Sequence, residues 1–326
     1  MSESPKDLVR EVRNVYDADV IVYFGPISRP HDDTLITQCR LNKQRKNVVL
    51  CIATLGGDAN PAYRIARTLQ KHYATGKEPG KVFAYVVSIC ASAGTLLVLG
   101  ADELILSPHA ELGPVDVQLR RNDEVGERTS GLTPVQALEY LREEGVNLFQ
   151  QHFMAMRFGE DLSFPTSIAS KVAAEITSGC LGKLYEQIDP LRVAEINRTL
   201  LIAMHYGNKI DKNLKPGAFE RLLRGYPAHD CVIDPEEAKE LFKTISDPKE
   251  PLSKLGDGLK PLADKLLFSK QAKVAYLFEE TNEHTEPDGG DGTVNNGAAI
   301  QDNGQPREAN PKVEAAQEGE TVHKRS

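Results

Sequence analysis

Long apolar stretches are missing from this chain of 326 residues. Because a helix that crosses a membrane needs about 18 or more consecutive apolar residues, we expect no membrane span. The opening residues, MSESPKDLVREVRN, also lack the apolar core of a secretory signal peptide. We therefore expect a cytoplasmic location.

Cysteine is scarce and carries none of the spacings that hold a metal. The five cysteines are an odd number and none belongs to a CxxC pair. Cys51 and Cys90 lie in apolar runs, so we interpret them as buried, reduced thiols rather than as disulfides or metal ligands. Neither a GxGxxG fingerprint nor a Walker loop is visible, so no nucleotide cofactor is expected and no metal is expected.

Basic stripes are absent, and the net charge of the chain is −8. Residues 281–326 contain no Leu, Phe, Tyr or Trp, and they carry nine acidic and four basic residues. Such a segment cannot bury enough apolar surface to offset the entropy of ordering, so we expect a disordered acidic tail. The rest of the chain is only weakly acidic, and we expect no nucleic-acid partner.

Two successive patterns of strand, tight turn and helix stand out in the first third of the chain. Residues 47–53 read as a buried strand that ends at Gly56 and Gly57, before the helical pattern 62–70. Residues 82–88 read as a second buried strand, followed by small residues around Ser92 and a further helical run. Two such units fit a right-handed βαβ arrangement, which places both turns at one edge of a parallel sheet.

Ser92 is the candidate nucleophile because it stands where a strand meets the start of a helix. Free N–H groups and the positive end of a helix dipole at this position help to stabilise an oxyanion. Gly56 and Gly57 allow close backbone approach and positive φ angles, so their turn can supply the other half of an oxyanion hole. Two alternatives remain open: Ser92 is only a helix N-cap, or the neighbouring Cys90 is the nucleophile.

The segments TLGGDANPAYRIARTL and CASAGTLLVLGADELILSPHAELGPVD resemble the Clp-protease/crotonase fold. Within that fold they are most similar to the serine dehydrogenase proteinase family, which is related to signal peptide peptidase A. The resemblance covers roughly residues 15–118 and resumes at GYPAHDCVIDPEEAKELF. It implies a serine peptidase with Ser92 as the nucleophile and the backbone N–H groups of Gly57 and Ala93 as oxyanion donors.

The resemblance does not supply the histidine of the Clp proteases as general base, because the position of that histidine falls at about Leu112. Asp230 matches the Clp catalytic aspartate, and the stretch SGCLGK resembles the lysine motif of signal peptide peptidases and makes Lys183 our first choice. Lys171 and His109 are alternative bases. Each lysine is otherwise an ordinary surface side chain. Asp116 follows Gly-Pro-Val and either orients a base or binds substrate, or simply caps a turn.

The predicted fold class is α/β, with a Clp/crotonase-type ββα spiral core and an additional helical region. We divide the chain into an N-terminal segment (1–14), the core (15–118), a helical extension that closes the core (119–250), a C-terminal helical segment (251–280) and the acidic tail (281–326). Strands are expected at 16–26 and 103–106. Helices are expected at 33–41, 134–144, 164–177, 189–205 and 236–242, with ends at Ser178-Gly179 and Gly207-Asn208.

Three functions remain to be distinguished. The first is a cytoplasmic serine peptidase that acts on peptides or unfolded proteins. The second is a crotonase-like acyl-CoA enzyme, although such enzymes need no serine nucleophile. The third is a non-catalytic scaffold. The resemblance also implies a homo-oligomer, and any dependence on ATP has to come from a separate partner.

Overall fold

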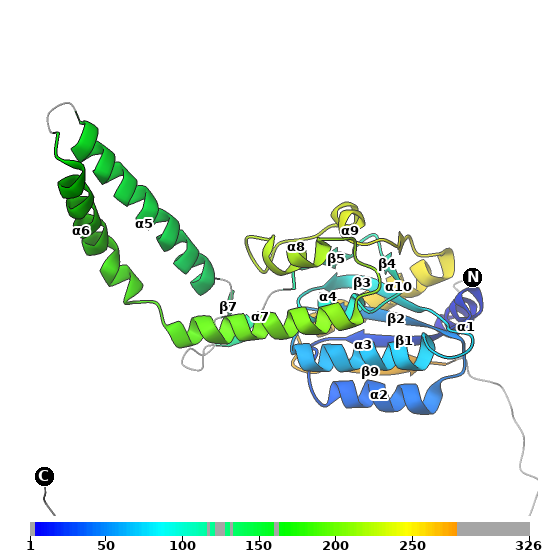
Figure 1. Ribbon diagram of the computed structural model, residues 1–326. Helices are drawn as coiled ribbons and strands as arrows, with labels where there is room; N and C mark the ends of the chain where they lie inside the picture. Colours follow the sequence, from blue (N-terminus) through cyan, green and yellow to red (C-terminus); the bar gives the residue numbers. More distant parts are fainter. Residues whose placement is uncertain (1–3, 116–117, 121–127, 131–132, 160–162, 279–326) are drawn as a thin grey trace, which may run out of the picture. The chain divides into compact units, whose positions relative to one another are not determined.

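A parallel sheet forms the centre of the protein in the computed structural model, which describes residues 4–115, 118–120, 128–130, 133–159 and 163–278 (Figure 1). Its strands lie in the order β8-β4-β3-β2-β1-β9, and β5 pairs with the end of β3. All of these pairings are parallel except that of β9 with β1. The strands are β1 (Ala18–Phe24), β2 (Asn47–Thr54), β3 (Val82–Cys90), β4 (Glu103–Leu106), β5 (Glu111–Leu112), β8 (Ile245–Ser246) and β9 (Lys273–Leu277).

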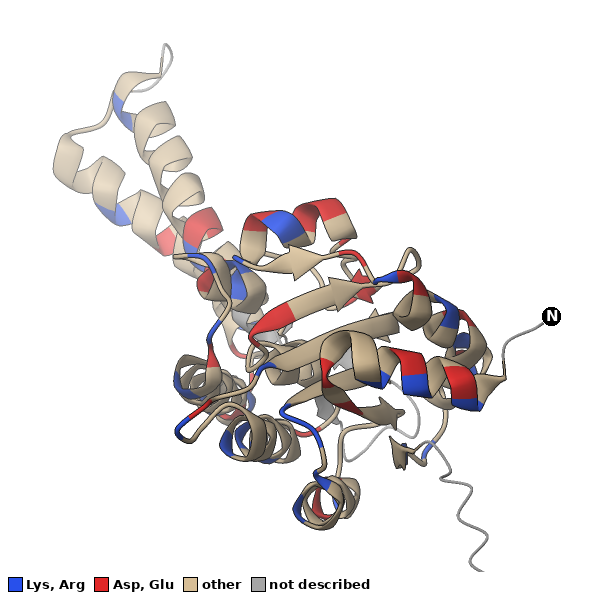
Figure 2. Ribbon diagram, turned by 90° about the vertical axis from the view of Figure 1, so that its right-hand side faces the viewer, with Lys and Arg blue, Asp and Glu red and all other residues tan. Residues whose placement is uncertain are grey.

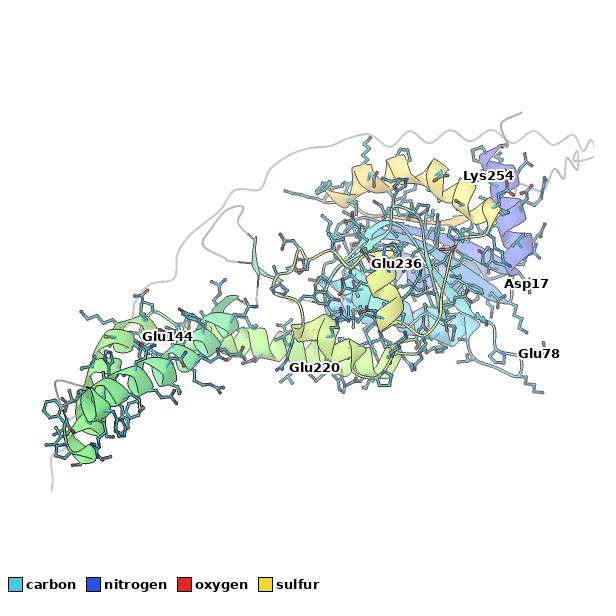
Figure 3. The ribbon with its side chains drawn as sticks, turned by 90° about the horizontal axis from the view of Figure 1, so that it is seen from above. Asp17, Glu78, Glu144, Glu220, Glu236 and Lys254 are labelled. Carbon is cyan, nitrogen blue, oxygen red and sulfur yellow. The ribbon has the colours of Figure 1, made fainter. Side chains whose placement is uncertain are left out.

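The central strands are apolar along their whole length because helices cover both faces of the sheet. One face packs against α2 (His31–Asn42), α3 (Ala59–Tyr73) and α4 (Ala93–Val98), and the other packs against α1 (Pro5–Tyr16) and α10 (Glu250–Leu267). In Figure 3, the label Lys254 marks α10, and the label Asp17 marks the end of α1. The two helices are in contact. Figure 2 shows that the coloured charged residues lie mainly on the helices, whereas the strands are mostly tan.

The remaining described elements follow β5 in the chain. They are a two-stranded ribbon of β6 (Gln118–Arg120) and β7 (Arg128–Ser130), a helical hairpin of α5 (Thr133–Phe158) and α6 (Thr166–Tyr185), the long helix α7 (Pro190–Ile210), and the short helices α8 (Ala218–Arg224) and α9 (Pro235–Leu241). Glu220 and Glu236 mark α8 and α9 in Figure 3. The α/β core with an additional helical region is therefore confirmed.

Two expected helix ends are wrong. Helix α6 continues through Ser178 and Gly179 to Tyr185, and α7 continues through Gly207 to Ile210. At Gly207 the reason is packing, because a Cβ there would lie 2.1 Å from the ring of Phe219. This glycine is needed for close approach rather than for ending the helix.

Two other segments also differ from the sequence-based expectation. Residues 5–16 form helix α1, which Ser4 caps with its side chain. The segment 251–280, expected to be helical, contains α10 and then strand β9. Strand β9 completes one edge of the sheet by pairing with β1.

Candidate active site

Ser92 lies in the turn between β3 and α4, with a backbone conformation that is unusual for a residue other than glycine. Its φ is 55° and its ψ is −118°, and the residue is buried. Its N–H donates to the carbonyl of Pro114 at 3.1 Å, and its own carbonyl accepts from Leu96 N–H at 3.0 Å. Strained backbone of this kind is held only where the surroundings fix it, and it is found disproportionately at functional sites.

The N-cap alternative for Ser92 is not what the structure shows. Ser92 occupies the N-cap position of α4, but its side chain makes no capping hydrogen bond to that helix. The hydroxyl is therefore not committed to the backbone N–H groups that a plain capping serine would satisfy.

The turn of Gly56 and Gly57 fits directly against Ser92. Gly56 has φ +106°, and a Cβ on it would lie 2.6 Å from Ser92 Cβ and 3.0 Å from Ser92 Oγ. Thr54 holds the turn by accepting the Gly56 N–H on its Oγ1 at 2.9 Å. On the next strand, Ala91 N–H donates to the Thr54 carbonyl at 3.0 Å. These contacts bring the end of β2 and the end of β3 together, as the βαβ pattern predicts.

Gly57 is constrained from its other side by the segment that follows β1. A Cβ on Gly57, whose φ is +148°, would lie 2.1 Å from the carbonyl oxygen of Ile27. Ile27 N–H donates to the Gly56 carbonyl at 2.9 Å, and Asp58 N–H donates to the Ile27 carbonyl at 2.8 Å. Neither of these two hydrogen bonds uses the Gly57 N–H.

Ser92, Gly57 and Ala93 line one pocket of about 450 Å³. Within the part of the chain that the structure describes, the N–H groups of Gly57 and Ala93 donate to no protein acceptor. Two such donors beside a hydroxyl are the arrangement that binds the oxyanion of an acyl-transfer intermediate. The other residues around this pocket are Ser28, Arg29, Asp58, Ala59, Asn60, Pro61, Leu96, Val115, Thr199, Ile202 and Ala203.

None of the four described candidate bases lines this pocket. Lys171 and Lys183 are exposed on α6, and Lys183 lies in the last turn of that helix rather than in a stretch ahead of a helix. Asp230 is exposed in the turn that precedes α9. Its segment is nevertheless attached to the site, because Ile233 and Leu112 exchange two backbone hydrogen bonds of 2.9 Å. Asp116 lies outside the described residues.

His109 lines a different pocket, of about 610 Å³, together with Ser88, Lys260 and Asp264. Ser88 Oγ donates to the Asp264 carboxylate at 2.7 Å. Burial raises the pKa of Asp264, but hydrogen bonds from Lys260 and Ser88 and the positive charges of Lys260 and His109 outweigh burial and lower it. The carboxylate of this second cluster is therefore held in its charged form by neighbours that do not include Ser92.

A Clp-type histidine base and a cysteine nucleophile would require the positions of Leu112 and Cys90. Both positions are buried among apolar residues. Leu112, where the Clp histidine is expected, packs in the core and pairs with Ile233. The Cys90 thiol is fully buried, and burial raises its pKa well above its ordinary value. Because the thiolate is the reactive form, Cys90 is a packing residue rather than a nucleophile.

No sequence pattern indicates that Thr199, Ile202 and Ala203 belong to the pocket. They lie about one hundred residues after Ser92 in the chain, on α7. Helical periodicity identifies the apolar side of α7, but it does not identify what that side packs against.

A family of known proteins matches the part of the chain that contains Ser92, Gly57 and Ala93. Residues 21–125 match the family model described as ClpP-like SDH-type serine proteinase. The matched residues make up about a third of the chain. The predicted family resemblance and the serine-peptidase class are confirmed at this level.

Two proteins of Methanocaldococcus jannaschii are similar to the chain. The uncharacterized protein MJ1495 is 25% identical over 238 residues, which are 67% of this chain and 72% of that protein. The uncharacterized protein MJ0137 is 34% identical over 87 residues, which are 27% of this chain and 28% of that protein.

Solved structures of the 1510-N membrane-bound stomatin-specific protease also match. A serine-to-alanine mutant shows 18% identity and a TM-score of 0.29, covering 47% of this chain and 66% of its own. A lysine-to-alanine mutant in complex with a substrate peptide shows 20% identity and a TM-score of 0.29, covering 48% and 70%.

Among the described residues, no group of three or more His, Cys, Asp or Glu side chains is placed to hold a metal ion. None of the helices within the described ranges is both long enough and apolar enough to span a membrane.

Proposed function

We propose that this protein is a serine peptidase that hydrolyses peptide bonds through an acyl-enzyme on Ser92. The observation that carries the proposal is the shared pocket of Ser92 with the backbone N–H groups of Gly57 and Ala93. A turn that only connects a strand to a helix requires neither the strained conformation of Ser92 nor the two N–H groups without a protein acceptor beside it. The match of residues 21–125 to a serine proteinase family supports the same chemistry.

In the first step Ser92 Oγ adds to the carbonyl carbon of the scissile peptide bond, and its proton passes to a general base. The carbonyl oxygen becomes an oxyanion that accepts hydrogen bonds from the Gly57 and Ala93 N–H groups. The C–N bond then breaks, and the departing amine takes a proton from the base. Water hydrolyses the resulting ester by the same route, which releases the acid and restores the serine.

The base remains a prediction, with Lys183 first, Asp230 as the catalytic aspartate, and Lys171 and His109 as alternative bases. Asp230 has the support that its segment is hydrogen-bonded to Leu112, two residues before the Pro114 carbonyl that holds the Ser92 N–H. Lys183 has the support of the SGCLGK motif, and Lys171 has the support of its apolar helical segment. Asp116 is proposed as a substrate-binding or orienting residue.

A fluorophosphonate probe tests the nucleophile directly. We expect it to label the folded wild-type protein at Ser92, and we expect Ser92→Ala to abolish labelling while the circular-dichroism spectrum stays unchanged. Failure to label the folded wild-type protein would overturn the peptidase proposal. Binding of an acyl-CoA thioester in that case would favour the crotonase-like alternative, and no binding would favour the scaffold.

The same probe identifies the base when it is applied to Lys183→Ala, Lys171→Ala, His109→Ala and Asp230→Asn. Loss of the base should slow labelling by about a hundredfold or more, because general-base catalysis contributes roughly 10²–10⁴-fold. The cytoplasmic location, the homo-oligomer, the peptide or unfolded-protein substrate and a separate ATP-dependent partner complete the proposal. They have the support of the family resemblance alone.

A further inference from the structure

Part of the Ser92 pocket is formed by the segment that follows β1. Ser28 and Arg29 line the pocket, and they come directly after Ile27 in the chain. The backbone of Ile27 is bonded to the oxyanion turn, because its N–H donates to the Gly56 carbonyl at 2.9 Å. Ser28 and Arg29 therefore start from a fixed position beside the oxyanion turn.

Ser28 has a hydroxyl proton to donate because of the way in which His31 is bonded. The Nε2 atom of His31 accepts the backbone N–H of Ala272 at 3.4 Å, so Nε2 carries no proton. The proton of the imidazole is then on Nδ1, which lies 3.1 Å from Ser28 Oγ and donates to it. The Ser28 oxygen is the acceptor in this hydrogen bond, and its own proton remains for a ligand in the pocket.

Arg29 carries a guanidinium that forms no ion pair with any carboxylate of the described residues. Two acidic residues follow it closely in the chain, but Asp32 and Asp33 both bind Arg64 of α3 instead. Because Arg29 is also exposed, its N–H groups are accessible from the pocket. A guanidinium of this kind is suited to a planar anion, which it binds through two parallel hydrogen bonds.

Asn60, in the first turn of α3, adds a further group of donors to the same pocket. Its Oδ1 accepts the Tyr206 hydroxyl at 2.7 Å, which identifies the other end of the amide as Nδ2. Across the ranges that the structure describes, the Nδ2 group donates to no protein acceptor. The lining therefore collects hydroxyl, guanidinium and amide donors from three residues.

Asp58 is the acidic residue of this lining, and its charge opposes the binding of an anion. Asp58 is exposed, so water screens that charge. A cation in the pocket would meet this single carboxylate, whereas an anion would meet three groups of donors. The balance of the lining therefore favours an anion that has several acceptor oxygens.

We propose that Ser28, Arg29 and Asn60 form a subsite for a carboxylate of the substrate, next to the scissile bond. The inference rests on the proposed function, because it names the substrate class of the same site. The substrates are peptides that are cleaved beside an acidic side chain or beside a free C-terminus, since both present the same planar group. Arg29 binds its two oxygens, and Ser28 and Asn60 orient it.

Protection of Ser92 from fluorophosphonate labelling tests the subsite with three ligands of nearly the same shape. N-acetyl-glutamic acid α-amide carries a side-chain carboxylate, N-acetyl-glutamine carries a terminal carboxylate, and N-acetyl-glutamine amide carries none. At least one carboxylate should halve the labelling rate at a concentration about tenfold lower than the neutral amide does, because hydrogen bonds between charged groups are the stronger ones. The ligand that does so identifies the source of the carboxylate.

Two substitutions should change this advantage of the carboxylate in opposite directions. Arg29→Gln should reduce it to about twofold or less, because a neutral amide lacks the charge and the paired donors of a guanidinium. Asp58→Asn should increase it, because the opposing charge is removed. Arg40→Gln is the matched control, since Arg40 is an exposed arginine of α2 that does not line the pocket, and it should keep the wild-type value.

Equal protection by all three ligands would overturn the subsite, while labelling of Ser92 continued to support the peptidase. An advantage that survives in Arg29→Gln, or one that falls in Asp58→Asn, would also overturn it. Absence of labelling in the folded wild-type protein would instead remove the proposed function, and this inference with it.

Discussion

The conformation of Ser92 costs stability, and the surrounding hydrogen bonds maintain it. A φ of 55° with a ψ of −118° is easy only for glycine. Its N–H is fixed by Pro114, and Gly56 closes over its Cβ. The serine is therefore retained for its hydroxyl, at a position where glycine would be the more stable choice.

We accordingly expect Ser92→Gly to be more stable than Ser92→Ala. Both variants lack the hydroxyl, so neither should react with a fluorophosphonate, and they differ in whether a Cβ must adopt the strained conformation. The difference in the free energy of unfolding should be about 1–3 kcal/mol, the usual range for a strained backbone residue. Urea unfolding measures it, and equal stability of the two variants would show that the turn is unstrained.

Gly56 and Gly76 separate backbone strain from steric contact with the nucleophile. Both have φ above +100°, but a Cβ on Gly56 would meet Ser92, whereas a Cβ on Gly76 would have nothing within 4 Å. Gly56→Ala should therefore lose about a hundredfold or more in kcat/KM, because a displacement on the order of 1 Å costs that much. Gly76→Ala should lose some stability and keep its activity. Similar activity in the two variants would contradict the contact.

At the scale of single elements, two contacts between α3 and α7 should contribute unequally to stability. One is made by Gln70 of α3, and the other is the hydrogen bond from Tyr206 of α7 to Asn60 of α3. Gln70→Leu leaves the buried carbonyls of Ile210 and Gly100 without their donor. It should lower the free energy of unfolding by about 1–3 kcal/mol, the cost of buried unsatisfied groups. Tyr206→Phe removes one exposed hydrogen bond and should cost roughly 0.5–1.5 kcal/mol or less. Chemical denaturation of both variants decides the order, and a larger loss in Tyr206→Phe would contradict it.

The elements that the sequence predicts well are those whose signal is local. Strands β2 and β3 each end in a turn of small residues before a helix, and periodicity identifies both. Strands β5 and β8 have two residues each, which is too short for a pattern, and β9 is defined by its pairing with β1. In the site, Ser92, Gly56, Gly57 and Ala93 come from these two turns. Ile202 comes from a distant helix whose packing partner no local pattern encodes.

At the scale of the whole molecule, charge and apolar content are distributed unevenly along the sequence. Residues 281–326 carry −5 of the net charge of −8 and contain no Leu, Phe, Tyr or Trp. The apolar core clusters of the described chain lie entirely between Leu8 and Leu277. Stability and chemistry should therefore both reside in the part of the chain that precedes this acidic segment.

A chain that ends at Glu280 tests this expectation. It should unfold at the same temperature as the full chain to within about 1–2 °C, because a segment without Leu, Phe, Tyr or Trp has little apolar surface to contribute to the free energy of unfolding. Fluorophosphonate labelling of Ser92 should proceed at the same rate, since the pocket is built from residues 28–203. What should change is the charge-dependent behaviour, with earlier elution from an anion-exchange column and lower solubility near neutral pH. A fall of several degrees in the melting temperature, or slower labelling, would show that the acidic segment contributes to the folded body.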